Sequence, residues 1–144
     1  MRLERGRCFC GAIQAEMTGV PFWVCYDHDD DCRRAIDGPL TIWIGYHSAQ
    51  FKWTAGCART FSKTRGVTRY FCGACGSSIA YTDEGLPGEI YITIGFTDAP
   101  ERFPPSAQAY WQMRLPFVVM DDGLPRIDAY TRPRDPAFGI PRDR

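Results

Sequence analysis

The sequence predicts a mostly β protein that folds as a single domain around a cluster of cysteines. Short runs rich in β-branched and aromatic residues recur along the chain between Gly and Pro residues, and helical periodicity is nearly absent. Two closely spaced cysteine pairs, Cys8 with Cys10 and Cys72 with Cys75, lie far apart in sequence, as the ligands of one structural metal ion often do. Together these observations favour a zinc-tethered domain of short antiparallel strands with little helix.

Length and charge restrict the class of protein. The 144 residues suit one domain, and 17 Lys and Arg residues balance 17 Asp and Glu residues, which gives no support for a nucleic-acid or anionic-membrane partner. Residues 1–7 lack the apolar run of a signal peptide, and no stretch approaches the roughly 18 apolar residues of a membrane span. We therefore expect a cytoplasmic protein whose seven cysteines are reduced and available to metal.

Strand-like segments follow one another through most of the chain. Residues 32–36 could form a turn or two of helix before Gly38 and Pro39 stop it. The β-favouring segments are residues 12–17, 21–27, 40–46, 51–54, 58–63, 67–71, 78–82, 89–96 and 108–112. After residue 130, three prolines among Arg and Asp residues predict a loosely held tail over 131–144, so the folded domain is expected to span residues 1–130.

The two cysteine pairs are predicted to share one zinc ion, with Cys8, Cys10, Cys72 and Cys75 as ligands. Four thiolates form closed structural zinc sites, and their binding energy contributes to folding. Gly11, Gly73 and Gly76 can adopt the positive φ that lets a backbone wrap an ion. The alternatives are four ordinary buried thiols, or disulfides in a secreted protein. Cys57 has no partner in this pattern and is expected to be a free thiol.

The segment 25–32 is a second candidate site. It places four carboxylates within five residues, and these repel one another unless a positive charge lies among them. In an extended chain Asp27 and Asp29 point to the same side, and a following turn would bring Cys32 to that side. Two carboxylates and a thiolate would suit a catalytic zinc ion, which keeps a coordination position open for water or substrate.

Residue chemistry leaves another interpretation of this segment open. Asp30 or Asp31 could cap a short helix, where acidic side chains are favoured by the helix dipole. The remaining acids would then form a solvated loop with Arg33 and Arg34 as counter-charges. Cys25 is either a core residue or a substitute metal ligand.

The combined motifs resemble the glutathione-dependent formaldehyde-activating enzyme family, which includes centromere protein V-like domains, over about residues 6–127. The resemblance rests on C-x-C-G near the start, on Cys-Arg-Arg-Ala at residues 32–35, and on the later segments 66–77 (GVTRYFCGACGS), 95–98 (GFTD), 103–105 (FPP) and 122–125 (DGLP). It implies a β-tent fold and a structural zinc ion on Cys8, Cys10, Cys72 and Cys75.

The same resemblance implies a second, catalytic zinc ion, which family members hold with the three cysteines of C-H-C-x-x-C and which accepts the glutathione sulfur. The matching positions in this chain are Asp27, Asp29 and Cys32. Each aspartate replaces one thiolate, so the formal charge is unchanged, but carboxylates are harder donors and favour water over a soft thiol. His28 lies where the family also has histidine, and we expect it to support the loop.

Three functions are compatible with these features. The resemblance implies carbon–sulfur lyase chemistry, in which a glutathione thiol adds to formaldehyde or the adduct is split. Cys32 would then act at the metal, and Arg33 or Arg34 would pair with a glutathione carboxylate. The alternatives are a diverged metal-dependent hydrolase and a non-catalytic zinc-stabilised binding module. The expected partner is a small thiol such as glutathione, with no nucleic acid and no membrane.

Overall fold

Strands of three to seven residues make up most of the fold. The computed structural model describes residues 1–138. Its strands are β1 (Leu3–Arg7), β2 (Gln14–Thr18), β3 (Trp23–Asp27), β4 (Thr41–His47), β5 (Phe51–Ala55), β6 (Arg59–Phe61), β7 (Val67–Phe71), β8 (Ser78–Asp83), β9 (Glu89–Thr93) and β10 (Ala107–Ala109). Its helices are α1 (Asp30–Ile36) and the 3-10 turns η1 (Ser48–Gln50), η2 (Ile94–Phe96), η3 (Pro100–Arg102), η4 (Trp111–Met113) and η5 (Pro136–Phe138). The predicted mostly β fold is confirmed.

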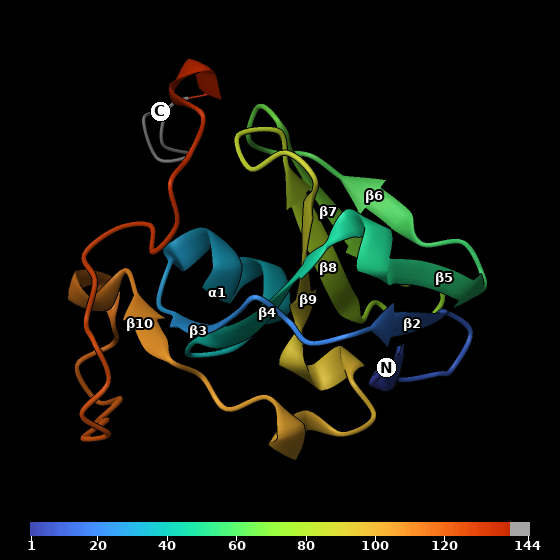
Figure 1. The fold of residues 1–144 in the computed structure, drawn as a ribbon. Coiled ribbons are helices and arrows are strands. Elements are labelled where there is room, and N and C mark those ends of the chain that lie inside the picture. Colours follow the sequence, from blue (N-terminus) through green and yellow to red (C-terminus); the bar gives the residue numbers. More distant parts are fainter. Residues whose placement is uncertain (139–144) are drawn as a thin grey trace.

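The strands form two sheets. The small sheet has the order β1-β2-β5, and the large sheet has the order β10-β3-β4-β9-β8-β7-β6. Figure 1 shows β2 and β5 at one side of the molecule and α1 and β10 at the other. The expectation of antiparallel strands needs one correction, because β10 pairs with β3 in parallel. The chain reaches β10 through a long irregular connection after β9, so it can approach β3 from the same end.

Both faces of β4 are buried, which divides the core in two. Ile44 and Tyr46 pack with Met17 of β2 in a cluster that joins the two sheets. Trp43 points to the opposite face, because successive side chains alternate along a strand, and packs there with Cys32 of α1. The single α-helix of the described residues therefore covers the face of the large sheet that the small sheet leaves open.

Strand β1 was not predicted, and its inward-facing residues explain why. The buried positions are Glu4 and Gly6, so the alternation of apolar and polar residues that indicates a strand is missing. Glu4 is buried because it forms ion pairs with Arg2 and with Arg102, the second at 3.1 Å. Gly6 lies against the ring of Phe96, which leaves no space for a side chain.

Other boundaries differ by a few residues. The segments 89–96 and 108–112 were predicted as single strands, but each ends in a 3-10 turn, η2 and η4. Helix α1 begins at Asp30, two residues earlier than expected, because the preceding acidic residue caps it. The segment β6 is shorter than the predicted 58–63. Such shifts are usual when the ends of an element are predicted from the hydrophobic pattern alone.

The segment 131–138 is tied to the large sheet by several side chains, whereas residues 139–144 of the predicted tail lie outside the described residues. Trp23 donates to the hydroxyl of Thr131 at 2.9 Å. Arg134 forms a buried ion pair with Asp83 at 2.6 Å. The domain boundary at residue 130 stays a prediction.

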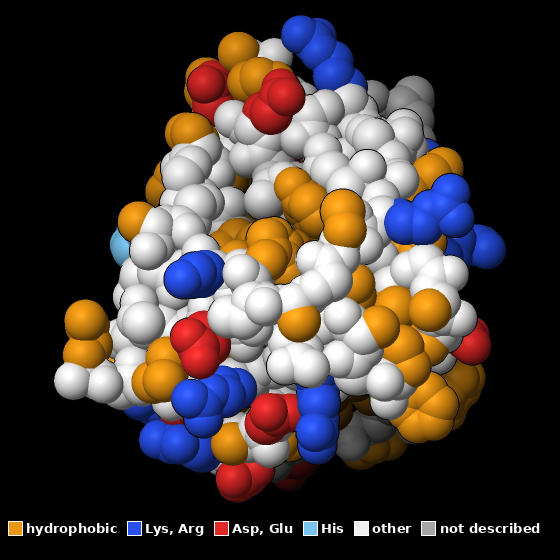
Figure 2. Space-filling view, turned by 90° about the vertical axis from the view of Figure 1, so that its right-hand side faces the viewer, with side chains coloured by type: hydrophobic (Ala, Val, Ile, Leu, Met, Phe, Trp, Pro, Cys, Tyr) orange, Lys and Arg blue, Asp and Glu red, His pale blue; other side chains and the backbone are white. Residues whose placement is uncertain are grey.

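The surface carries charges of both signs. In Figure 2, Lys and Arg side chains alternate with Asp and Glu side chains along the lower part of the face shown, and hydrophobic side chains are visible between them. Across the described residues, no helix has the length and apolar character needed to cross a membrane.

Candidate metal centre and adjoining pocket

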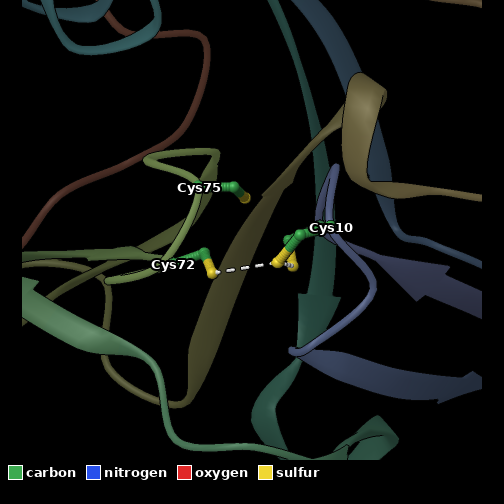
Figure 3. Close-up of side chains that lie close together, drawn as sticks. Cys10, Cys72 and Cys75 are labelled. Carbon is green, nitrogen blue, oxygen red and sulfur yellow. Dashed lines mark hydrogen bonds between the residues drawn. The ribbon is translucent and has the colours of Figure 1, made fainter.

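The two cysteine pairs come together in space. Cys8 and Cys10 lie in the turn after β1, and Cys72 and Cys75 lie in the turn between β7 and β8. The Sγ atoms of Cys8 and Cys10 are 3.6 Å apart, and those of Cys10 and Cys72 are 3.8 Å apart. All four sulfurs lie within 4.8 Å of one another. Figure 3 shows the side chains of Cys10, Cys72 and Cys75 converging from the two turns.

Backbone geometry holds these turns in shape. Gly11 has φ of 79° and Gly76 has φ of 78°, as the zinc interpretation requires, whereas Gly73 does not adopt positive φ. The amide of Gly11 donates to the Cys8 carbonyl at 2.9 Å, and the amide of Gly76 donates to the Cys72 carbonyl at 2.8 Å. Each pair of cysteines therefore lies on a closed turn whose shape depends on a glycine.

Neighbouring polar groups support the sulfurs. The backbone amide of Ile13 donates to Cys8 Sγ at 3.3 Å. The hydroxyl of Ser77 lies 3.2 Å from Cys75 Sγ and accepts a hydrogen bond from the backbone of Phe9, so it connects the two turns. Hydrogen bonds from Ser77 lower the pKa of the Cys75 thiol to about 5. Four converging sulfurs with hydrogen-bonded support fit a closed tetrahedral zinc site.

The second candidate site lies at the start of α1. Asp29 is the N-cap of this helix, and its carboxylate accepts from the backbone amide of Cys32 at 3.2 Å. The amide of Asp29 in turn donates to the carboxylate of Asp27 at 2.9 Å. The cap is thus Asp29 itself, whereas the sequence pointed to Asp30 or Asp31 for this role and to Asp29 for metal.

Asp27 and Cys32 do approach each other, but the third group beside them is a guanidinium. Cys32 Sγ lies 3.6 Å from Asp27 Oδ2 and 3.8 Å from an N–H of Arg69, which lies on β7. Burial raises the pKa of Asp27 to about 7. Burial, followed by the adjacent Asp27 carboxyl group, also raises the pKa of the Cys32 thiol. The structure thus places an acid, a thiol and a cation in contact at the buried end of β3.

The side chains of Asp27, Asp29 and Cys32 do not fit a second zinc ion as they lie. In the described residues, the groups of three or more ligand atoms within 4.8 Å are the four cysteines and Asp29, Asp30 and Asp31. Neither Asp27 nor Cys32 belongs to the acidic group, which consists of consecutive residues at a helix N-terminus, where such residues are favoured. A cation already lies against the one sulfur of the predicted ligand set.

Two cavities that share lining residues lie beside this site. The inner cavity, of about 40 Å³, is lined by Asp27, Cys32 and Arg69 among others. The outer pocket, of about 230 Å³, shares Arg69 with it and adds Arg34 and Lys63. The inner cavity has room for a molecule of a few atoms, and the outer pocket for part of a larger one.

The two predicted glutathione-binding arginines lie differently. Arg34 is exposed and lines the outer pocket. Arg33 instead donates to the backbone carbonyls of His28 and Met113, at 2.6 and 2.7 Å, and so fastens the start of α1 to η4. His28 is fully buried and lies 2.7 Å from the side-chain oxygen of Gln108 through its Nε2, in the loop-supporting position expected for it.

The remaining cysteines lie outside both sites. Cys25 is buried in a small core cluster, and its thiol donates to the carbonyl of Ala107 at 3.2 Å. Cys57 is exposed. Arg69 and Lys63 line the pocket, but the sequence analysis did not single them out. Arg69 lies within the segment 66–77 that carries the family resemblance, but a charged side chain in the middle of a β-favouring run usually indicates a solvent-facing position.

Comparison with known proteins identifies the family of this chain. The profile of the family described as glutathione-dependent formaldehyde-activating enzyme matches residues 3–113. The chain belongs to this family. No curated protein matches it. Among solved structures, it is similar to the crystal structure of a Rhodobacter sphaeroides protein, at 17% identity and a TM-score of 0.56. That likeness covers 85% of this chain and 98% of the other, and at this identity it shows the fold alone.

Proposed function

We propose that this member of the formaldehyde-activating family carries out carbon–sulfur lyase chemistry on a glutathione–formaldehyde adduct, with a structural zinc ion at Cys8, Cys10, Cys72 and Cys75. In the forward direction the S–H bond of glutathione adds across the C=O bond of formaldehyde. A C–S bond forms, and the thiol proton ends on the aldehyde oxygen, which gives S-hydroxymethylglutathione. The zinc ion holds the β1 turn to the β7–β8 turn, on the opposite side of the large sheet from Cys32.

The observation that carries the proposal is the two-part pocket. The inner cavity brings the Asp27 carboxyl group and the Arg69 guanidinium to one small space, and the outer pocket presents Arg34 and Lys63. Glutathione is a peptide with two carboxylates, so cations in the outer pocket suit its ends. Lys63 also pairs with Asp31 at 3.0 Å, so Arg34 is the stronger candidate for pairing with a carboxylate of glutathione. The family relation supports the choice of substrate.

The diverged hydrolase that the sequence also allowed depends on a second metal ion to activate water. We do not carry this alternative forward, because the ligand atoms of Asp27, Asp29 and Cys32 do not form a group within 4.8 Å of one another in the described residues, although all three side chains line the inner cavity. Cytoplasmic location is part of the proposal and is supported by the seven cysteines, which are all free. The non-catalytic binding module is the outcome to which a negative test would point.

The test follows S-hydroxymethylglutathione by NMR, with formaldehyde, glutathione and the zinc-loaded protein. We expect equilibration of thiol and adduct to be faster with protein than without it. Replacing Arg34 by Ala should raise the KM for glutathione roughly three- to tenfold, because one charge-assisted contact at a partly exposed site is lost. Lys52 on β5 is also exposed, and Lys52→Ala is the matched control. A rate equal to the uncatalysed one would contradict the proposal.

A further inference from the structure

Arg69 lies where the sequence predicted a second metal ion. A nitrogen of its guanidinium lies 3.8 Å from Cys32 Sγ. The same sulfur lies 3.6 Å from Asp27 Oδ2. The side chain extends from the middle of β7, opposite Tyr81 of β8, and its cationic end lies 5.7 Å from that ring. A fixed positive charge thus already faces the thiol and the acid that a metal ion would have joined.

One end of this guanidinium has no partner. Arg69 Nη1 is buried, and no hydrogen-bond acceptor contacts it within the described residues. Buried N–H groups are nearly always paired, so an unpaired one in a cavity wall indicates a missing ligand that can accept a hydrogen bond. The inner cavity of about 40 Å³ that Arg69 lines is too small for glutathione but has room for a small carbonyl compound.

We propose that Arg69 takes the place of the second metal ion and that Cys32 adds directly to a small aldehyde bound in the inner cavity. The sulfur of Cys32 forms a bond to the carbonyl carbon while the C=O π bond breaks. Asp27 accepts the thiol proton and returns it to the oxygen, next to the unpaired N–H of Arg69. The product is an enzyme-bound thiohemiacetal, and the reaction needs no metal ion, oxidant or second thiol. Only the identity of the aldehyde as formaldehyde rests on the proposed function.

The positions of the three groups suit these roles. The thiol lies between a group that can take its proton and a group that can stabilise negative charge on the new alkoxide. Cys32 is 5% exposed and Asp27 is 6% exposed, so water competes little for either. Cys25 is also buried, but within the described residues no hydrogen bond joins its thiol to Asp27 or Arg69, and the thiol lies within hydrogen-bond distance of backbone carbonyls instead.

The test uses the zinc-loaded full chain with Cys57 replaced by Ser, which removes the exposed thiol outside the four-cysteine cluster. Isotope-labelled formaldehyde is added without glutathione, and the carbon signal of a protein-bound thiohemiacetal is followed by NMR. We expect a signal that disappears in Cys32→Ser. Arg69→Lys should weaken the adduct about tenfold or more, because the second N–H of the planar fork is lost. Arg5→Lys, on the exposed side of β1, is the matched control and should leave the adduct unchanged.

Other outcomes would overturn the inference. They are a signal that survives Cys32→Ser, and equal adduct stability in Arg69→Lys and the control. Metal content supplies a readout that does not depend on labelling. We expect one zinc ion per chain, unchanged by Asp27→Asn or Arg69→Lys, whereas a second zinc ion lost in Asp27→Asn contradicts the inference.

The inference and the proposed function can fail separately. Adduct formation without glutathione turnover would support the inference and refute the lyase. Turnover retained in Cys32→Ser would support the lyase and refute the role of Cys32 as a nucleophile.

Discussion

Asp27 shows how burial sets the chemistry of a single residue. Its carboxyl group lies at the end of β3, where it accepts from the Asp29 amide and from the Cys32 thiol. Removal from water disfavours the charged form, and the pKa of Asp27 rises to about 7 from 3.8. Near neutral pH this residue can therefore both hold and accept a proton, which an exposed aspartate does poorly.

This pKa predicts a pH dependence of stability. Between about pH 4 and pH 7 the folded protein keeps a proton on Asp27 that the unfolded chain has lost, so the free energy of unfolding falls as pH rises through this range. The slope contributed by one group is at most about 1.4 kcal/mol per pH unit. Asp27→Asn cannot titrate, so its stability relative to wild type should rise across this range and level off above it.

Urea denaturation at a series of pH values measures this difference. Subtracting the two proteins removes the pH dependence of zinc binding, which both share. Asp121→Asn, at an exposed position, should follow wild type throughout. Parallel curves for Asp27→Asn and wild type would show that Asp27 is ionised in the folded protein.

Helix α1 shows how the same acidic residues can suggest both a helix cap and a metal site. Its acidic start looked like a set of metal ligands, but Asp29 caps the helix and Asp30 and Asp31 occupy its first turn. The cap places Cys32 on the buried side, against Trp43, and leaves Arg34 facing the outer pocket. The helix thus connects the inner cavity to the outer pocket.

Replacing Asp29 by Ala should lower the free energy of unfolding by about 1 kcal/mol, because the helix loses its cap. Asp29→Ser should recover most of this loss, since a serine hydroxyl also caps well. Zinc content per chain should stay the same in both variants. Thermal or urea unfolding and elemental analysis measure the two quantities. A fall in zinc content in both would instead return Asp29 to the role of metal ligand.

At the scale of the whole molecule, two distant turns are joined through four cysteines. The turn after β1 belongs to the small sheet and the turn before β8 to the large sheet, so a zinc ion would fasten one sheet to the other. Structural zinc sites contribute about 10 kcal/mol or more, which is comparable with the whole stability of a typical domain. Without the zinc ion, we expect the hydrophobic contacts between the two sheets to be lost.

We therefore expect Cys72→Ser to lose zinc and to be largely unfolded at room temperature. Circular dichroism and elemental analysis of purified protein test this. Cys57→Ser is the matched control, because Cys57 is exposed and lies outside the cluster. A folded, zinc-free Cys72→Ser protein with the thermal stability of the control would refute the structural role of the metal.

The segment after β10 makes a second long-range connection. Arg134 is paired with Asp83, and both side chains are buried, at 8% and 1% exposure. Arg134→Met should lower the free energy of unfolding by about 3–5 kcal/mol, because it leaves a buried carboxylate without its cation. The double variant Arg134→Met with Asp83→Leu should recover part of the loss, and urea denaturation measures both. A loss below about 1 kcal/mol in the single variant would mean that the segment is only loosely held.

The sequence by itself determined the mostly β fold and the cysteine cluster. Strand patterns such as residues 67–71 depend on local alternation, and the close spacing within each cysteine pair is typical of metal ligands. Strand β1 escaped prediction, because its inward positions are Glu4 and Gly6, whose burial depends on Arg102 and Phe96 far along the chain.

Only the tertiary structure decided which groups surround Cys32. The sequence placed Asp27, Asp29 and Cys32 close together, but it could not show that Asp29 turns back to cap a helix. Nor could it show that the β7–β8 pairing brings Arg69 against Cys32 from 37 residues away. Local spacing determines which ligand types are near one another, whereas the register of distant strands determines which charge finally faces them.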